Sequence, residues 1–187
     1  MADEQGDGDA GDDAQASATH VGATEGPPGK RARRRPEPTA TQRALGLLTR
    51  REHSRKELVR KLTSRGMDAA EVESAVTRLA GDGWQDDARF AESLVRARVS
   101  AGYGPVRIRA ELATHGLDRD AIARALDSFD GDWAEIASDL VRRRFGPVAS
   151  FDLSRQRKVT DFLIRRGFDR ASVQAAVRGR DDGDVEG

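Results

Sequence analysis

Apolar residues recur through the middle of this 187-residue chain with the spacing of one buried helical face. The clearest cases are Leu58 and Leu62, Ile108 and Leu112, and Val159 and Leu163. Pairs four positions apart are typical of amphipathic helices, and the alternating pattern that would indicate strands bounded by turns does not occur. The hydrophobic pattern therefore predicts an all-α protein.

The pattern occurs three times in one register, at offsets of 50 and then 51 residues. Each aliphatic pair is followed four positions later by Gly, an apolar residue and Asp. The three copies of this ending are Gly66-Met67-Asp68, Gly116-Leu117-Asp118 and Gly167-Phe168-Asp169. The register continues through Val72, Ile122 and Val173, and through Val76, Leu126 and Val177. Three copies in one register predict a repeat protein.

Each copy is expected to hold three helices. The recurring Gly falls where a left-handed residue ends a second helix, and the Asp two residues later can cap a third. Asp68-x-x-Glu71 and Ser54-x-x-Glu57 fit capping boxes, and Pro105 fits a first helical turn. The first helices are expected at about 41–51, 87–100 and 133–145, the last two after the N-caps Asp86 and Asp132.

These elements predict nine helices in three tandem three-helix repeats, at 39–81, 82–129 and 130–178. The segments 1–38 and 179–187 have too few apolar residues to offset their ordering entropy, and we expect both to be disordered. Because one unit has little core, repeats that share apolar faces should form an elongated, curved, solenoid-like array. The predicted core comprises Leu45, Leu48, Leu58, Leu62, Val72, Val76, Leu79, Phe90, Leu94, Ile108, Leu112, Ile122, Leu126, Leu140, Val159, Leu163 and Val177.

The formal net charge is +0, but the charges are distributed unevenly. Residues 1–29 hold seven acidic residues and residues 181–187 hold four, with no Lys or Arg in either segment. The stretch 30–180 therefore carries all 32 basic residues against 21 acidic ones, a net of +11. A positive body favours anionic partners such as nucleic acid. Of the bases, 28 are Arg, which forks onto phosphate better than Lys, although a GC-rich genome explains that content equally well.

Patterns for catalysis or metal binding are not found. Without Cys there is no disulfide or thiolate site, and the three His lack metal-ligand spacing. Gly6-x-Gly8-x-x-Gly11 matches the dinucleotide fingerprint but lacks the strand and helix that give it meaning. Asp86-Asp87 is better explained by a helix cap and the helix dipole than by paired catalytic carboxylates. We expect no catalytic residue, metal or cofactor.

Targeting signals are also not found. No stretch approaches the ~20 apolar residues needed to span a bilayer, and the N-terminus has no apolar run of a secretory signal. We expect a cytoplasmic protein with no membrane contact.

Basic groups remain as candidates for binding a partner or nucleic acid. For any single Arg we favour a solvated face with local pairs, such as Glu57 with Lys61 and Arg107 with Glu111. An aromatic residue beside several Arg can be a stacking or anchoring site, although a packed turn tyrosine is the preferred interpretation of Tyr103. The candidates are Arg50, Arg51, Arg55, Lys56, Arg60, Lys61, Arg96, Arg98, Tyr103, Arg107, Arg109, Arg142, Arg143 and Arg144.

Two stretches resemble bacterial RecX regulatory proteins. Residues 44–58 (ALGLLTRREHSRKEL) resemble the opening of that family. Residues 83–91 (GWQDDARFA) and residues 102–112 (GYGPVRIRAEL) resemble its central signature. The resemblance covers about 41–178, and the third copy is matched mainly by its repeat register. Gln85 departs from the apolar residue often found there, and the long acidic start lies outside the common pattern.

The resemblance implies three tandem three-helix repeats, in agreement with the hydrophobic pattern, and a role that is not catalytic. It also implies a partner, the RecA recombinase filament on single-stranded DNA. RecX proteins restrain the growth of that filament or promote its disassembly, and so lower strand exchange, ATP hydrolysis and co-protease activity in DNA repair and the SOS response. We expect a monomer whose basic body lies in the filament groove, with each repeat touching a successive subunit.

Two other functions stay open. A direct DNA-binding protein with helix-turn-helix-like units would show steep salt dependence and sequence preference without a recombinase. Beside single-stranded DNA, double-stranded DNA is left open as a partner. A helical scaffold for another protein would need neither DNA nor filament. The acidic tails are a further hypothesis: by covering the basic surface they would weaken unproductive DNA binding.

Overall fold

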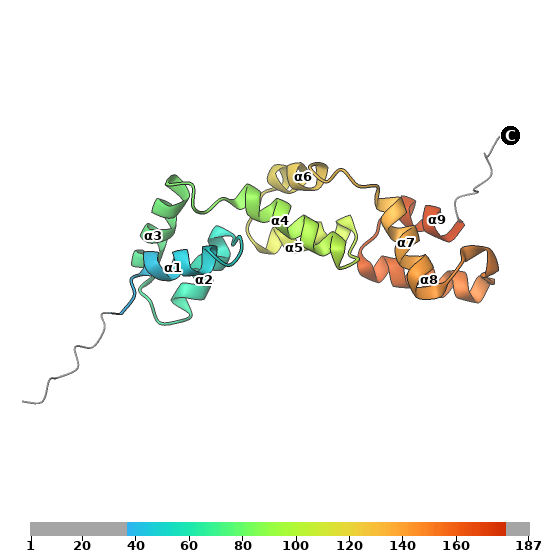
Figure 1. The fold of residues 1–187 in the computed structure, drawn as a ribbon, viewed down its shortest axis with the longest axis horizontal. Helices are drawn as coiled ribbons and strands as arrows, with labels where there is room; N and C mark the ends of the chain where they lie inside the picture. Colours follow the sequence, from blue (N-terminus) through green and yellow to red (C-terminus); the bar gives the residue numbers. More distant parts are fainter. Residues whose placement is uncertain (1–36, 179–187) are drawn as a thin grey trace, which may run out of the picture. The chain divides into compact units, whose positions relative to one another are not determined.

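The computed structural model describes residues 37–178, and Figure 1 shows their helices in chain order. These residues form nine α-helices and one 3-10 helix, with no strand, which confirms the predicted all-α class. The segments predicted to be disordered lie outside the described residues, apart from Glu37 and Pro38. The helices are α1 (Ala40–Leu48), α2 (Arg55–Thr63), α3 (Ala69–Gly81), α4 (Asp87–Ser100), α5 (Pro105–Thr114), α6 (Arg119–Asp127), α7 (Trp133–Phe145), η1 (Val148–Ser150), α8 (Leu153–Arg166) and α9 (Arg170–Arg178).

The helices pack in groups of three, which we call repeat 1 (α1–α3), repeat 2 (α4–α6) and repeat 3 (α7–α9). Each repeat has a hydrophobic cluster of its own. In the described part of the chain, only Trp133 packs against the clusters of two repeats. The expectation that neighbouring repeats share apolar faces is therefore wrong: burial is completed inside each three-helix unit.

Most of the predicted core is confirmed, including Leu58, Ile108 and Val159, which are fully buried. Five predicted core residues are only partly buried, because they pack at the margin of the hydrophobic cluster of their own repeat. Small residues of the first helices, such as Ala44, Ala91 and Ala137, are buried instead and allow close helix packing. The five are Leu45, Leu48, Leu94, Leu140 and Val177.

The helix ends follow local chemistry. Gly66, Gly116 and Gly167 have φ of 83°, 86° and 82°, the left-handed conformation predicted after each second helix. Side chains of Asp68, Asp118 and Asp169 accept backbone N–H bonds at the start of each third helix. Asp86 and Asp132 cap α4 and α7 as predicted. Pro105 is the first residue of α5.

Three local predictions fail in detail. Ser54 accepts the N–H of Glu57, but the Glu57 carboxylate binds other side chains, so the capping box is not closed. Asp68 likewise accepts the N–H of Glu71 without the return bond. The helix expected at 41–51 ends at Leu48, where the chain turns away.

Consecutive repeats meet through equivalent positions of the repeat. At the first junction, Oγ of Ser54, the N-cap of α2, lies 2.9 Å from Nδ1 of His115, the C-cap of α5. At the second, the N–H of Gly104, the N-cap of α5, donates to the carbonyl of Arg166 at the end of α8, at 2.9 Å. Gly104 follows Ser54 by 50 residues and Arg166 follows His115 by 51, the offsets of the hydrophobic pattern. At both junctions, the start of the second helix of one repeat thus contacts the end of the second helix of the following repeat.

The second junction is a close backbone contact. The N–H of Val106, in the first turn of α5, donates to the carbonyl of Gly167 at 3.0 Å, so a helix end that has no side-chain cap is satisfied by repeat 3. A Cβ at Gly104 would lie 2.4 Å from the oxygen of Gly167. A Cβ at Gly167 would lie 2.4 Å from Cβ of Arg107. Glycine is required at both positions because the two backbones touch.

Candidate partner-binding surface

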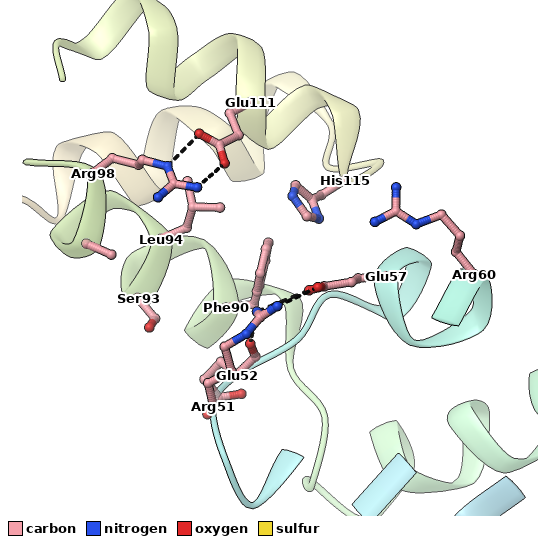
Figure 2. A pocket seen from close by; sticks show the side chains of 11 residues that line it. Arg51, Glu52, Glu57, Arg60, Phe90, Ser93, Leu94, Arg98, Glu111 and His115 are labelled. Carbon is pink, nitrogen blue, oxygen red and sulfur yellow. Dashed lines mark hydrogen bonds and ion pairs between the residues drawn. The ribbon is translucent and has the colours of Figure 1, made fainter. Parts of the chain in front are cut away.

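The predicted basic group of repeat 1 is organised around one buried acid. Glu57 has a side chain that is 6% exposed. Arg51 donates to both of its oxygens, at 2.5 and 3.2 Å, and Nζ of Lys61 lies 2.9 Å from Oε1. Figure 2 shows Arg51 reaching Glu57 from the turn between α1 and α2. The predicted Glu57–Lys61 pair is confirmed, and two of the candidate cations are engaged inside the repeat.

Burial raises the pKa of Glu57, but hydrogen bonds from Arg51, Lys61 and His53 outweigh it and lower the pKa to about 2. Nδ1 of His53 lies 2.9 Å from Oε2 of the same carboxylate. Burial lowers the pKa of His53 below 6.5, against the opposing effect of Glu57. At neutral pH the cluster therefore holds an ionised Glu57 beside a neutral His53.

The rest of this group faces solvent to different degrees. The guanidinium of Arg55 donates to Oγ1 of Thr77 at 2.5 Å and to Glu73 at 3.3 Å, so it is directed back onto α3. Arg50, Lys56 and Arg60 are exposed. Three of the six candidate cations in repeat 1 thus remain outward.

A hollow of about 480 Å³ lies where repeat 1 meets repeat 2 (Figure 2). Its charges are balanced, because three acidic and three Arg side chains line it beside His115, whose pKa burial lowers. Two of the three Arg are paired at short distance with two of the acids, so the lining has no excess of positive charge. The charged lining comprises Arg51, Glu52, Glu57, Arg60, Arg98 and Glu111.

Arg98 forms the second of these pairs. Its Nε and Nη2 donate to the two oxygens of Glu111 at 2.7 and 2.6 Å, and Figure 2 shows this two-point contact. The hydrogen bond from Arg98 is the main reason that the pKa of Glu111 is lowered, and the same bond raises the pKa of Arg98. The predicted Arg107–Glu111 pair is therefore wrong, because Arg98 of the neighbouring helix occupies the carboxylate.

The Tyr103 turn brings two guanidinium groups to one ring. Arg107 lies 4.7 Å from the centre of the Tyr103 ring and Arg166 lies 5.0 Å from it. Both distances suit cation–π contact. Tyr103 is half-buried, so the packed interpretation is the one that the structure favours. Of the other candidates in repeat 2, Arg96 lies 3.7 Å from Glu92 and Arg109 is exposed.

The Arg residues that end α7 have separate environments. Arg142 pairs with Asp139 at 2.5 Å. Nε of Arg143 donates to the backbone carbonyl of Asp139 at 3.3 Å. Arg144 lies over the rings of Phe145 and Phe162, at 5.8 and 5.0 Å. Arg143 and Arg144 thus face carbonyl or aromatic groups and not carboxylates.

Several junction residues were not among the candidates. Asp87 does more than contribute to a helix dipole: its Oδ1 accepts from the N–H of Arg55 and from Nε2 of Gln85, each at 2.8 Å. Gln85 also donates to the carbonyl of His53 at 3.3 Å, which explains a buried polar residue at that position. Arg166 was missed although it occupies the repeat position of His115, and this shared register was the available signal.

Net charge differs between the repeats. Residues 39–81 hold nine bases and five acids, and residues 130–178 hold ten and seven. Residues 82–129 hold seven bases and eight acids, a net of −1. The positive charge of the body is therefore concentrated in repeats 1 and 3 and in the segment that precedes α1.

No group of His, Asp and Glu in the described ranges is arranged to hold a metal ion. Among residues 37–178, no helix is long and apolar enough to cross a membrane.

The repeats match known protein families. Residues 40–79 match the model of the first three-helix domain of RecX, and residues 86–126 match that of the second. Two solved structures have a similar fold. One, the crystal structure of a regulatory protein RecX, is 26% identical with a TM-score of 0.62 over 75% of this chain and 70% of that one. The other, RecX from Lactobacillus salivarius, is 22% identical with a TM-score of 0.63 over 74% and 92%.

Similarity to bacterial proteins extends over more than two repeats. The regulatory protein RecX of Stenotrophomonas maltophilia strain R551-3 is 60% identical over 151 residues, which are 81% of this chain and 93% of the relative. The regulatory protein RecX of Xanthomonas campestris pv. campestris strain B100 is 59% identical over 152 residues, 81% and 94% of the two chains. With matched repeats, a shared fold and this identity, the chain belongs to the RecX family of regulatory proteins.

Proposed function

We propose that this protein binds the RecA recombinase filament on single-stranded DNA and lowers its strand exchange, ATP hydrolysis and co-protease activity in DNA repair and the SOS response. Membership of a family of regulatory proteins is the observation that carries the proposal. In this proposal the protein acts in the cytoplasm as a monomer, by adhesion and without a cofactor.

The junction geometry supports a partner that is itself periodic. Because both junctions use the same positions of the repeat, the three units present related surfaces in succession. A helical filament offers one site per subunit, and several weak contacts to successive subunits add through effective concentration. Binding lowers ATP turnover only if the protein prefers a filament state that cannot cycle or grow.

The structure sorts the candidate contact residues. Arg51, Lys61 and Arg98 are held in two-point or buried ion pairs, so we assign them to the stability of the repeats. Exposed cations are the better candidates for contacting the filament, and we take Arg60 from repeat 1 and Arg109 from repeat 2. An exposed cation at the edge of a binding surface mainly affects the rate of association with the partner and the salt dependence of that rate.

The test is inhibition of the DNA-stimulated ATPase of the host recombinase. We expect Arg60→Glu combined with Arg109→Glu to raise the concentration for half-inhibition about tenfold, because reversed rim charges slow encounter and repel an acidic surface. Arg78→Glu combined with Arg124→Glu is the matched control pair, an equal charge change at exposed residues of α3 and α6, and should alter that concentration less than about twofold. If the wild-type protein leaves ATP turnover unchanged, the proposed function is rejected. Unchanged inhibition by the Arg60→Glu/Arg109→Glu variant would exclude only Arg60 and Arg109 as contact residues.

Direct binding of duplex DNA by helix-turn-helix-like units has less support. A continuous track of phosphates favours a continuous positive surface, whereas the middle repeat has a net charge of −1. Salt-dependent, sequence-selective binding to duplex DNA without recombinase would favour this alternative.

A further inference from the structure

A second hollow, of about 390 Å³, lies where the end of α4 meets α7 and α8. Ile136, Leu140 and Phe162 contribute its apolar part. Three Arg side chains also line it, and no acidic residue of the described ranges does. We call this site the Arg hollow, and its three cations are Arg143, Arg144 and Arg166.

None of the ion pairs among residues 37–178 involves a guanidinium group of the Arg hollow. Nη1 of Arg166 donates to the carbonyl of Ala101 at 3.0 Å, and Cζ of Arg166 lies 5.3 Å from the centre of the Phe162 ring. Arg144 lies 5.0 Å from the same ring. A guanidinium has five N–H donors, so contact with a carbonyl or a ring leaves most of them available. The groups are therefore oriented by the fold and keep their full positive charge.

This environment differs from that of the other hollow. Between repeats 1 and 2, three acids offset three Arg, and Arg51 and Arg98 each make a two-point contact with a carboxylate. The Arg hollow has the same number of guanidinium groups and none of the acids. Of these two sites, only the Arg hollow combines uncompensated positive charge with apolar and aromatic walls.

The junction keeps the Arg hollow in shape. Backbone bonds from Gly104 and Val106 to the end of α8 fix repeat 2 against repeat 3, at 2.9 and 3.0 Å. Gly102 lies in the wall with φ of 75°, and a Cβ there would come within 3.3 Å of Leu140. The absence of a side chain at Gly102 leaves the space beside Leu140 open.

We propose that the Arg hollow binds one nucleotide of a single-stranded nucleic acid. The forked N–H groups of Arg143, Arg144 and Arg166 suit the oxygens of one phosphodiester. The apolar walls and the guanidinium planes suit an unstacked base, which finds such surfaces in single-strand binding sites. A volume of about 390 Å³ suits one unstacked nucleotide and is too small for a base pair to enter.

This inference rests on the proposed function only for the choice of single-stranded DNA as the partner. The same chemistry would recognise a free nucleotide, so the test must separate a strand from a mononucleotide. An acidic protein segment would satisfy the Arg charges but would not depend on a base.

The experiment measures binding of the full-length protein to a fluorescein-labelled 20-nucleotide oligo(dT) by anisotropy, at low salt and without recombinase. We expect Arg143→Gln combined with Arg144→Gln to weaken binding about tenfold and to reduce the slope of log affinity against log salt by roughly 1, because one phosphate contact is lost. Arg142→Gln combined with Arg165→Gln is the charge-matched control variant, since both residues are exposed and neither lines the hollow. Its affinity should stay within about twofold of wild type. Circular dichroism verifies that all variants fold.

Two further probes identify the ligand. An abasic strand of equal length should bind wild type at least about fivefold more weakly, and this difference should shrink in the double variant, because a base no longer enters. Thymidine monophosphate should compete only at millimolar concentration. Competition at micromolar concentration, or equal binding of abasic and normal strands by wild type, would overturn the assignment to a base-bearing strand.

Equal losses in the charge-matched control variant and in the Arg143→Gln/Arg144→Gln double variant would show general charge attraction and reject the Arg hollow as a site. The recombinase ATPase assay separates this failure from failure of the proposed function. A double variant that binds oligo(dT) like wild type, while wild type inhibits the recombinase, removes only the nucleotide site. A double variant that loses oligo(dT) binding, while wild type does not inhibit the recombinase, leaves the site standing and removes the regulatory role.

Discussion

Replacement of Glu57 by Gln removes the negative charge on which Arg51, His53 and Lys61 converge. The side chain is nearly the same size, so the change tests charge and not packing. Arg51 and Lys61 would then surround the neutral amide of Gln, which does not balance their two positive charges inside repeat 1. We expect a large loss of stability, because breaking a buried ion pair leaves the remaining charges unpaired.

The magnitude follows from the pKa. The pKa of Glu57 falls from 4.5 to about 2 in the fold, a difference of roughly 2.5 units, and each unit corresponds to about 1.36 kcal/mol. Ionised Glu57 therefore stabilises the fold by about 3 kcal/mol at neutral pH. Because the folded pKa is depressed, this contribution is complete above pH 4.5 and is lost as the pH falls towards 2. At pH 3 roughly half of it remains.

Urea denaturation followed by circular dichroism measures the effect. At pH 7 the free energy of unfolding of Glu57→Gln should be lower than that of wild type by about 3 kcal/mol, and at pH 3 the difference should be about half as large. Glu92→Gln is the control, since the Glu92 side chain is 44% exposed and lies 3.7 Å from Arg96; it should cost less than about 1 kcal/mol. A Glu57→Gln protein as stable as the control, or one whose deficit does not shrink with acid, would refute the reasoning.

Other predictions test the junctions and the acidic start. Gly104→Ala should destabilise the protein by roughly 2 kcal/mol or more in urea denaturation, because the added Cβ meets the Gly167 backbone. Gly46 is an exposed helical glycine whose added Cβ would have no atom within 4 Å, so Gly46→Ala should stabilise the protein by up to about 1 kcal/mol. Burial lowers the pKa of His115 in the fold, so its contribution to stability is present above pH 6.5 and is lost as the pH falls below that value. His115→Gln should therefore reduce the change in the free energy of unfolding between pH 7.5 and 5.5. An unchanged pH dependence would exclude His115 as its cause. Deletion of residues 1–29 removes seven acidic residues and no base, and should tighten non-specific DNA binding at low salt but not at high salt, as measured by anisotropy.

The helices and their ends were predictable because each depends on residues within about four positions. Asp118 caps α6 and Gly116 ends the preceding turn, and both signals lie beside the element that they define. The ion pair between Arg98 and Glu111 was not predictable from such signals. Local spacing favoured Arg107 for Glu111, but packing of α4 against α5 brought the other guanidinium to the carboxylate.

The sequence by itself determined the thrice-repeated helical unit, because periodic apolar positions, left-handed glycines and capping acids act locally. Tertiary structure alone decided that each repeat buries its own core, that Ser54 meets His115 and Gly104 meets Arg166, and which Arg residues are neutralised. Those contacts join residues about 60 positions apart, and many equally polar partners compete for them along the chain. Only the packed geometry selects among them, and with that choice it left three guanidinium groups without acids in the Arg hollow.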